Sequence, residues 1–351
     1  MAEIQQRKGS FEYGQYAHRK YMLIAIGIAV AVIIFLVDLF FSIPYISPMD
    51  LFNAFIHPDE VSNVMRIILW DLQMPTVCAG LVCGAAFGLA GAIMQTLLNN
   101  PLASPYTLGI SAGAGFGASL AMVVGLGSLS ILGAYLVPAS AFIFAMLATA
   151  GIFLVAKAKG FSADVMVLAG IGLVFLFQAL QSLMQYLASP DALSGIVFWT
   201  FGSLNGIEWN EVAIIFVLFV ITFFLIYRKS WALTAMRLGD RRAESLGINT
   251  QYMRKWMFVL VALMTSTCVA FVGCIGFIGI VGPHVARMIL GEDQRYLLPM
   301  SCVCGAIILV AADILCGTIT SGMEYPIGIF TSIVGVPFFF YLLVKKKTVK
   351  P

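Results

Sequence analysis

Four polar side chains with helical spacing stand inside an apolar stretch near the middle of the chain. They are Gln178, Gln181, Ser182 and Gln185, which share one helix face over two turns. Three amides facing lipid would be costly, so this polar stripe must face protein or water. It could supply hydrogen bonds between helices. We favour the lining of a translocation path, because an uncharged stripe suits a large polar solute better than a proton relay.

Carboxylates within the apolar stretches are few. Asp313 lies deep in a late stretch, and Asp38 lies near the outer end of the first. Ion-coupling chemistry at Asp313 would make the chain an ion-coupled secondary transporter, which is the alternative hypothesis. We assign Asp313 a structural role instead, as a hydrogen-bond partner for a broken helix end. His284 has no second ligand at suitable spacing and is also assigned a structural role.

The sequence contains none of the usual catalytic or cofactor-binding motifs. It has no Gly-Lys-Ser/Thr phosphate loop, no nucleophile motif and no metal-ligand cluster. Its seven cysteines lie within or at the ends of apolar spans and are expected to pack as small hydrophobic residues. We therefore expect no catalytic residue, no cofactor, no metal site and no nucleic-acid partner. Transport driven by ATP would require an ATPase on another polypeptide.

The composition requires an all-α integral membrane protein. Of the 351 residues, 61% are hydrophobic and 11% are charged, and the apolar runs are long enough to cross a bilayer. We expect one domain over residues 21–344, between tails at 1–20 and 345–351. Glycines at 80, 84 and 88, and at 109, 113 and 117, predict close helix–helix packing. About ten spans are expected, near 22–42, 72–96, 107–126, 131–156, 165–187, 211–228, 254–272, 276–290, 298–317 and 326–344.

The distribution of lysine and arginine predicts the orientation. With both termini in the cytoplasm, nearly every cation falls on the cytoplasmic side and Arg66 alone falls outside. The chain is therefore expected to lie in a lipid bilayer, and the resemblance described below implies the cell membrane of a prokaryote. Parity then requires two short spans or a re-entrant segment between Arg254 and Arg287, where glycines and Pro283 interrupt the apolar stretch.

The largest cytoplasmic loop covers residues 228–255. Within it, residues 238–248 (the coupling segment) predict a short amphipathic helix that starts near Asp240 and stops at Gly247. This segment could be a solvated connector. It could equally be a docking element for a cytoplasmic partner.

Motifs along most of the chain, from about Trp70 to Leu343, resemble the permease subunits of type II ABC importers, the iron–siderophore, haem and cobalamin (FecCD) permease family. The motifs, in chain order, are Gly84–Gln95 with Asn100-Pro101-Leu102-Ala103, Leu108-Gly109-Ile110-Ser111, Trp199-x-x-Gly202-Ser203-Leu204, Leu238-Gly239-Asp240 with Ser245-Leu246-Gly247, Gly276-Phe277-Ile278-Gly279, Pro283-His284-x-x-Arg287, Ala312-Asp313, Glu324-Tyr325-Pro326-Ile327-Gly328 and Gly335-Val336-Pro337-Phe338-Phe339.

The resemblance implies a ten-span subunit that pairs with itself or with a paralogue. It further implies two cytoplasmic ATPase subunits and an extracytoplasmic substrate-binding protein, with the pathway at the subunit interface along the fifth and tenth spans. Iron(III)–siderophore is the first expectation for the cargo, and haem and cobalamin are alternatives. Such a subunit carries cargo and is not itself an enzyme.

The resemblance also assigns roles to residues. The coupling segment would contact the ATPase through Leu238, Gly239, Asp240, Arg241, Arg242, Glu244, Leu246 and Gly247. Phe161, Ser162 and Ala163 match the family's cytoplasmic gate by position. Structural or helix-breaking roles fall to Asn100, Pro101, Gly109, Gly276, Gly279, Pro283, His284, Arg287 and Asp313.

One departure from the family pattern concerns the outer face. Gln73-Met74-Pro75-Thr76 stands where the family usually has an Arg-Leu-Pro-Arg pattern that faces the binding protein. The expected docking residues here are Gln73, Thr76 and Glu324. Because the outer loops are rich in Asp and Glu, we expect a binding protein whose docking face is more basic, or less acidic, than the family norm.

Overall fold

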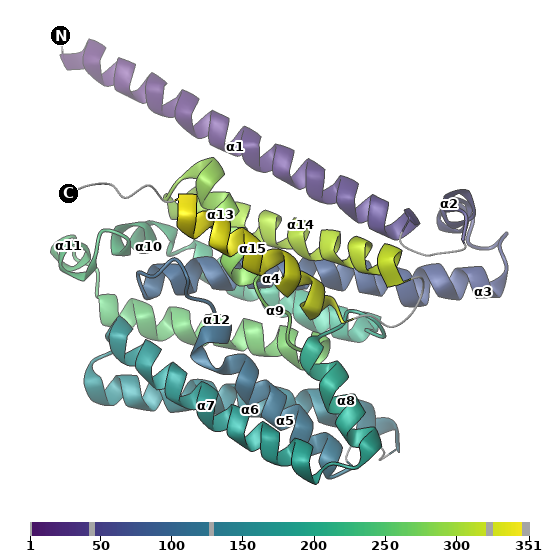
Figure 1. Cartoon of the computed structure of the whole chain (residues 1–351). Coiled ribbons are helices and arrows are strands. Elements are labelled where there is room, and N and C mark those ends of the chain that lie inside the picture. The colour runs from purple at the N-terminus through teal and green to yellow at the C-terminus, as the bar shows by residue number, and fades with distance from the viewer. Residues whose placement is uncertain (1, 42–45, 126–129, 321–325, 346–351) are drawn as a thin grey trace.

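The computed structural model describes residues 2–41, 46–125, 130–320 and 326–345 (Figure 1). Within these ranges the chain forms helices and connections without a strand, which confirms the all-helical fold class. The elements are α1 (Ala2–Phe41), α2 (Pro48–Ile56), α3 (Asn63–Arg66), η1 (Ile67–Gln73), α4 (Met74–Leu97), η2 (Tyr106–Leu108), α5 (Ile110–Val123), α6 (Ser130–Lys159), α7 (Ala163–Leu187), α8 (Pro190–Phe201), α9 (Trp209–Tyr227), α10 (Ser230–Met236), α11 (Asp240–Ser245), α12 (Thr250–Val272), α13 (Ile278–Leu290), α14 (Gln294–Thr320) and α15 (Ile327–Lys345).

Among the described residues, seven helices are long and apolar enough to cross a membrane, and three shorter apolar helices accompany them. Each of these ten overlaps one of the ranges predicted from the sequence. The short helices α5 and α13 have 14 and 13 residues. A helix of that length rises only about 20 Å, less than the ~30 Å of a hydrocarbon core. Their connecting loops therefore lie within the protein, where other helices can satisfy the backbone.

The short helix α10 was missing from the sequence prediction, and so were α2 and α8. The latter two are too short to span, with 9 and 12 residues, and both begin with serine as the N-cap followed by proline. Ser-Pro is a recognisable helix start, so this signal was present in the sequence. At the N-terminus, the region expected as a tail is helical from Ala2 and continuous with the first span.

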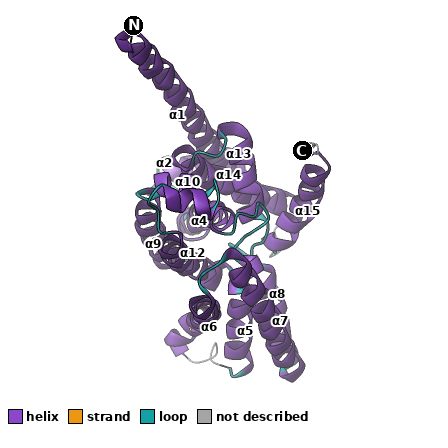
Figure 2. Ribbon diagram, turned by 90° about the vertical axis from the view of Figure 1, so that its left-hand side faces the viewer, coloured by secondary structure: helices purple, strands orange, loops and turns teal. Residues whose placement is uncertain are grey.

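The central element is α4, which packs against α9, α10, α12, α13, α14 and α1. Figure 2 shows α4 enclosed by neighbouring helices, with α5, α6 and α7 gathered on one side and α1 projecting from the other. A Cβ atom at Gly84 would lie 2.6 Å from the carbonyl oxygen of Gly305 on α14. One at Gly88 would overlap the carbonyl oxygen of Ser301, also on α14. The predicted glycine-mediated packing is therefore confirmed, since here backbone meets backbone.

The second glycine series serves a different pair of helices. Cβ atoms at Gly113 and Gly117 would lie 2.7 and 2.5 Å from carbonyl oxygens of Phe144 and Ser140 on α6. Gly109, the first of the series, has a φ of 79° and is the N-cap of α5. That left-handed conformation suits glycine, and it turns the chain from η2 into α5.

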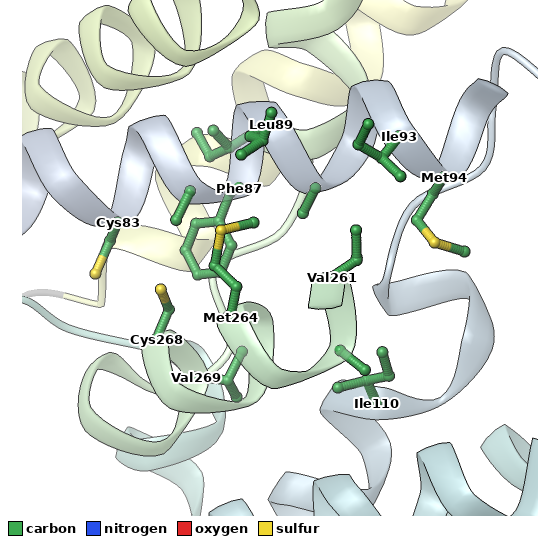
Figure 3. Close-up of a cluster of buried hydrophobic side chains, with 14 of the residues drawn as sticks. Cys83, Phe87, Leu89, Ile93, Met94, Ile110, Val261, Met264, Cys268 and Val269 are labelled. Atoms are coloured by element: carbon green, nitrogen blue, oxygen red, sulfur yellow. The ribbon is translucent and has the colours of Figure 1, made fainter. Parts of the chain in front are cut away.

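Among the described residues, the largest hydrophobic cluster includes the side chains that lie between α4 and α12 (Figure 3) and extends to neighbouring helices. Phe87 lies beside Met264, and the thiols of Cys83 and Cys268 face each other. The cysteines act as core residues, in agreement with the sequence analysis. Most residues of α4 are buried, so this helix packs against the protein on nearly every side.

The two ends of the bundle differ in charge. At the end where α4 terminates, beside α10 and α11 in Figure 1, lie Lys20, Arg237, Arg254 and Arg287; we call it the basic end. At the opposite end, near α2 and α3, Trp209 at the start of α9 donates to the Trp70 carbonyl in η1, and the exposed acids Asp71 and Glu208 lie beside them; we call it the acidic end. The cytoplasmic assignment of the basic end stays a prediction.

The glycine contacts generate a prediction for stability. Gly88→Ala should destabilise the protein by roughly 1–3 kcal/mol, because the methyl group would force α4 and α14 apart. Gly172→Ala on α7 is the matched control, since no atom lies within 4 Å of the position that its Cβ would occupy. Thermal unfolding in detergent measures both variants. Equal melting temperatures would contradict the direct backbone contact.

Candidate functional site

The end of α4 is buried at the basic end, so its last carbonyl groups need partners within the protein. The chain leaves the helix through Asn99, whose φ is 45°. The amides of Asn99 and Asn100 donate to the carbonyls of Thr96 and Gln95, which is a Schellman motif. The predicted helix-breaking role of Asn100 fits this geometry, and Pro101 follows it.

Arg254, in the first turns of α12, supplies the next partner. Its Nε donates to the carbonyl of Leu97 at 2.9 Å, and its Nη1 donates to the carbonyl of Phe161 at 3.4 Å. Its Nη2 forms a 2.6 Å ion pair with Asp240 Oδ1. One guanidinium group thus joins the end of α4, the predicted gate and the coupling segment.

The coupling segment forms the expected short helix, α11. Asp240 is its first residue, and Gly247 follows it with a φ of 81° and closes a second Schellman motif with Ile248. Ala243 is fully buried, whereas Leu238 and Leu246 are 54% and 53% exposed. The segment therefore presents two leucines to its surroundings at the basic end.

The other residues of the coupling segment lie on α11 or next to it. Gly239 is the N-cap of α11, with a φ of 93°. Arg241 and Arg242 are exposed on α11. The Glu244 carboxylate accepts a 2.8 Å hydrogen bond from the hydroxyl of Thr250, at the start of α12. Glu244 and Asp240 thus both connect α11 to α12.

The predicted gate lies between α6 and α7. Gly160 and Phe161 both have positive φ, 87° and 48°. The Phe161 ring is buried in an edge-to-face contact with Phe153, whose ring centroid is 5.1 Å away. Ser162 is the N-cap of α7, accepting from the amide of Val165, and Ala163 is the first helical residue. A residue with a side chain is unusual at this φ, so its surroundings hold Phe161 in place.

A second polar network ties α4 to α13 and to the turn before α14. Arg287 Nη2 donates to Gln95 Oε1 at 2.8 Å, and Arg287 also forms a 3.1 Å ion pair with Glu292. Arg237 of the α10 C-cap contacts Glu292 at 2.9 Å and the Gln95 carbonyl at 3.4 Å. Arg287, assigned a structural role from the sequence, therefore lies at a helix junction.

The sequence motifs that contain Ser203, Gly276 and Pro283 meet where α12 turns into α13. The turn contains Gly273 and Phe277, both with positive φ. The amide of Ser203 donates to the carbonyl of Val272 at 3.0 Å. Gly276 lies in this turn, whereas Gly279, Pro283 and the half-buried His284 lie inside α13. The break therefore falls at 273–277, earlier than Pro283 alone would place it.

The polar stripe on α7 is divided by the structure. Gln178 and Ser182 are exposed and Gln185 is half-buried. Gln181 instead turns inward, and its Nε2 donates to the hydroxyl of Thr200 on α8 at 3.0 Å. Gln181 thus supplies a hydrogen bond between helices, whereas the lining of a translocation path by the other three residues stays a prediction.

The acidic end contains a cavity of about 640 Å³. The expected docking residues Gln73 and Thr76 line it, together with the exposed acids Asp71 and Glu208. The described residues that line it include no lysine or arginine. Glu324, the third expected docking residue, lies outside the described residues.

The intramembrane acids lie together. Asp38 on α1 and Asp313 on α14 are 0% and 1% exposed, and their carboxyl groups interact with each other. The pair links α1 to the bundle, and the hydrogen bond from Asp313 to a broken helix end stays a prediction. Within the described residues, His, Cys, Asp and Glu form no group of three that could hold a metal ion.

Sequence reasoning missed the role of Arg254, which it counted only as a cytoplasmic cation. The signal was weak: Arg254 lies one turn inside an apolar helix, where a buried arginine would need partners. Those partners, Leu97 and Phe161, are 157 and 93 residues away in sequence. Their identity could not be read from local spacing.

Comparison with known proteins identifies several relatives of this chain. An ABC transporter permease protein of Methanocaldococcus jannaschii is 38% identical over 288 residues, which cover 80% of this chain and 82% of the relative. The iron(3+)-hydroxamate import permease of Bacillus subtilis is 31% identical, with coverage of 92% and 97%. The vitamin B12 import permease of Vibrio cholerae is also 31% identical, with coverage of 94% and 95%.

A solved structure of a metal-chelate type ABC transporter in an inward-facing conformation has a similar fold. Its TM-score is 0.80 at 27% identity, and the match covers 92% of this chain and 99% of that one. The profile of the FecCD transport family matches residues 29–345. The chain therefore belongs to the FecCD transport family.

Proposed function

We propose that this chain is the membrane subunit of an ATP-driven importer of bulky metal chelates, with iron(III)–siderophore as the first candidate cargo. Relatives are named for iron hydroxamate, for hemin and for vitamin B12. These cargoes are all large molecules that contain a chelated metal. As a member of this family of ABC permeases, the chain is a multi-pass membrane transport subunit and not an enzyme.

The observation that carries the proposal is the exposed face of the coupling segment. A short helix with two half-exposed leucines, fixed to the bundle by buried Ala243 and by Asp240, is a suitable docking element. Exposed apolar residues rimmed by charge mark protein–protein contact sites. The proposed partner is a pair of cytoplasmic ATPase subunits at the basic end, which is then the cytoplasmic side.

The proposed pathway follows the surface of α7, at an interface with a second permease subunit, either a copy or a paralogue. Gln178, Ser182 and Gln185 would line it as neutral hydrogen-bonding groups. Residues 161–163 would form the cytoplasmic gate. At the opposite end, the cavity that includes Asp71 and Glu208 would receive an extracytoplasmic binding protein.

The first test is co-purification of the tagged protein in mild detergent. A stoichiometric ATPase subunit in the preparation supports the importer. Transport in proteoliposomes under an ion gradient alone, with no ATPase present, would contradict the proposal and return attention to Asp313.

Docking through the coupling segment should depend on its exposed leucines. Leu246→Asp should lower the amount of co-purified ATPase about tenfold or more, because it places a charge in a desolvated contact. Val64→Asp at the acidic end is the control, since Val64 is 67% exposed and lies far from α11. Unchanged co-purification of the Leu246 variant would argue against this docking surface.

The exposed Gln178 and the hydrogen-bonded Gln181 should respond differently to substitution by leucine. Gln178→Leu should slow cargo uptake about fivefold without changing thermal stability, since one hydrogen bond to the passing solute is worth about 1 kcal/mol. Gln181→Leu should instead lower the melting temperature, because it removes the bond to Thr200. Uptake of iron(III)–hydroxamate in proteoliposomes and thermal unfolding separate the two effects. If both variants changed uptake and melting temperature in the same way, the difference in role between Gln178 and Gln181 would be contradicted.

Binding-protein docking should depend on the acids of the cavity. Glu208→Lys should weaken binding of the cognate binding protein about tenfold and reduce its salt dependence. Asp59→Asn, an exposed acid outside the cavity, is the control. Surface plasmon resonance at two salt concentrations measures both. Tighter binding by the Glu208 variant would mean that the partner presents acids.

A further inference from the structure

We propose that Arg254 is the positioning residue that transmits movement of the coupling segment to the gate. This inference rests on the proposed function, since it presumes that an ATPase acts on α11. Its basis is the set of three contacts made by one guanidinium group: Asp240 on α11, Phe161 at the gate and Leu97 at the end of α4.

The first contact is the exposed one. Asp240 is 47% exposed, whereas the Arg254 side chain is 6% exposed. A partner that moves α11 therefore acts on Asp240 from outside, and Arg254 passes the displacement into the protein. A bond between two charged groups is short and strong, so the two side chains move together.

The second contact is at the gate. The Phe161 carbonyl accepts from Arg254, and the Phe161 backbone has the positive φ that residues with a side chain rarely adopt. A segment in such a conformation persists only when its surroundings hold it there. Moving the Arg254 donor removes one of the holding contacts, so the loop can relax to another conformation.

The third contact supplies a fixed point. Leu97 is fully buried at the end of α4, and α4 is held by backbone contact with α14. Arg254 Nε remains on this carbonyl while Nη1 and Nη2 point to the two loops. Only arginine offers a planar fork with donors in fixed directions; lysine has one compact charge and cannot serve three separated acceptors in the same way.

The experiment measures hydrogen exchange in the complete complex of permease and ATPase, with and without bound ATP. Peptides covering 238–248 report on docking, and peptides covering 157–165 report on the gate. In the unaltered protein, both should change their exchange rates when ATP binds. In Arg254→Lys, peptide 238–248 should still respond while the response of 157–165 falls about tenfold, as expected for the loss of a hydrogen bond to a charged group.

The same complexes report coupling through ATP hydrolysis. Arg254→Lys should keep hydrolysis but lower the iron(III)–hydroxamate transported per ATP, whereas Arg19→Lys, a matched change at an exposed arginine of α1, should leave both unchanged. A merely structural role would lower yield and melting temperature without separating hydrolysis from transport. If Arg254→Lys fails to assemble, Asp240→Asn tests the same link, because it removes only the exposed half of the ion pair.

The outcomes distinguish this proposal from the proposed function. A gate response of Arg254→Lys and Asp240→Asn equal to that of the unaltered protein overturns the role of Arg254 and leaves the importer intact. Absence of any response at 238–248 in the unaltered complex overturns docking at α11, and with it both proposals.

Discussion

The carbonyl groups at the end of α4 are the constraint around which the basic end is built. α4 ends inside the protein, so water cannot satisfy its last acceptors. The backbone amides of Asn99 and Asn100 in the following turn donate to these carbonyls. The guanidinium groups of Arg237 and Arg254, from distant helices, donate to them as well. Cations at a helix C-terminus also interact favourably with its dipole. Each arginine that satisfies α4 has donors left over, and those donors reach α11, the gate and the turn before α14.

Glycine contacts decide which parts of this arrangement can move. Where α4 meets α14 through Gly84 and Gly88, backbone lies against backbone, and little sliding is possible without a clash. The coupling segment and the loop at Gly160 and Phe161 have no such contact; α11 is only six residues long and its leucines are exposed. We therefore expect these two segments to move more readily than α4 and α14.

The sequence predicted those features of the fold that depend on residues close together in the chain. Glycine spacing predicted the close helix contacts, and Asp240 and Gly247 predicted the start and stop of α11, because capping and packing depend on residues a few positions apart. The helix α8 was missed because twelve residues are too few to be recognised as a span. Arg254 was missed for a different reason: its partners are set by the tertiary fold, and the sequence pattern favoured the general rule that cations lie in the cytoplasm.

The two ends of the molecule meet different physical demands, and their chemistry differs accordingly. In the proposed importer, force delivered at the basic end must reach the predicted gate, which requires short, charge-assisted hydrogen bonds between buried and exposed groups, as in Arg254 and Asp240. At the acidic end, the proposed function requires recognition of a soluble binding protein that associates and dissociates. Exposed acids such as Asp71 and Glu208 around an open cavity raise the rate of encounter with a basic face while adding little permanent affinity. A rigid ion-pair network there would oppose release, so the concentration of such networks at the basic end agrees with an importer energised from that side.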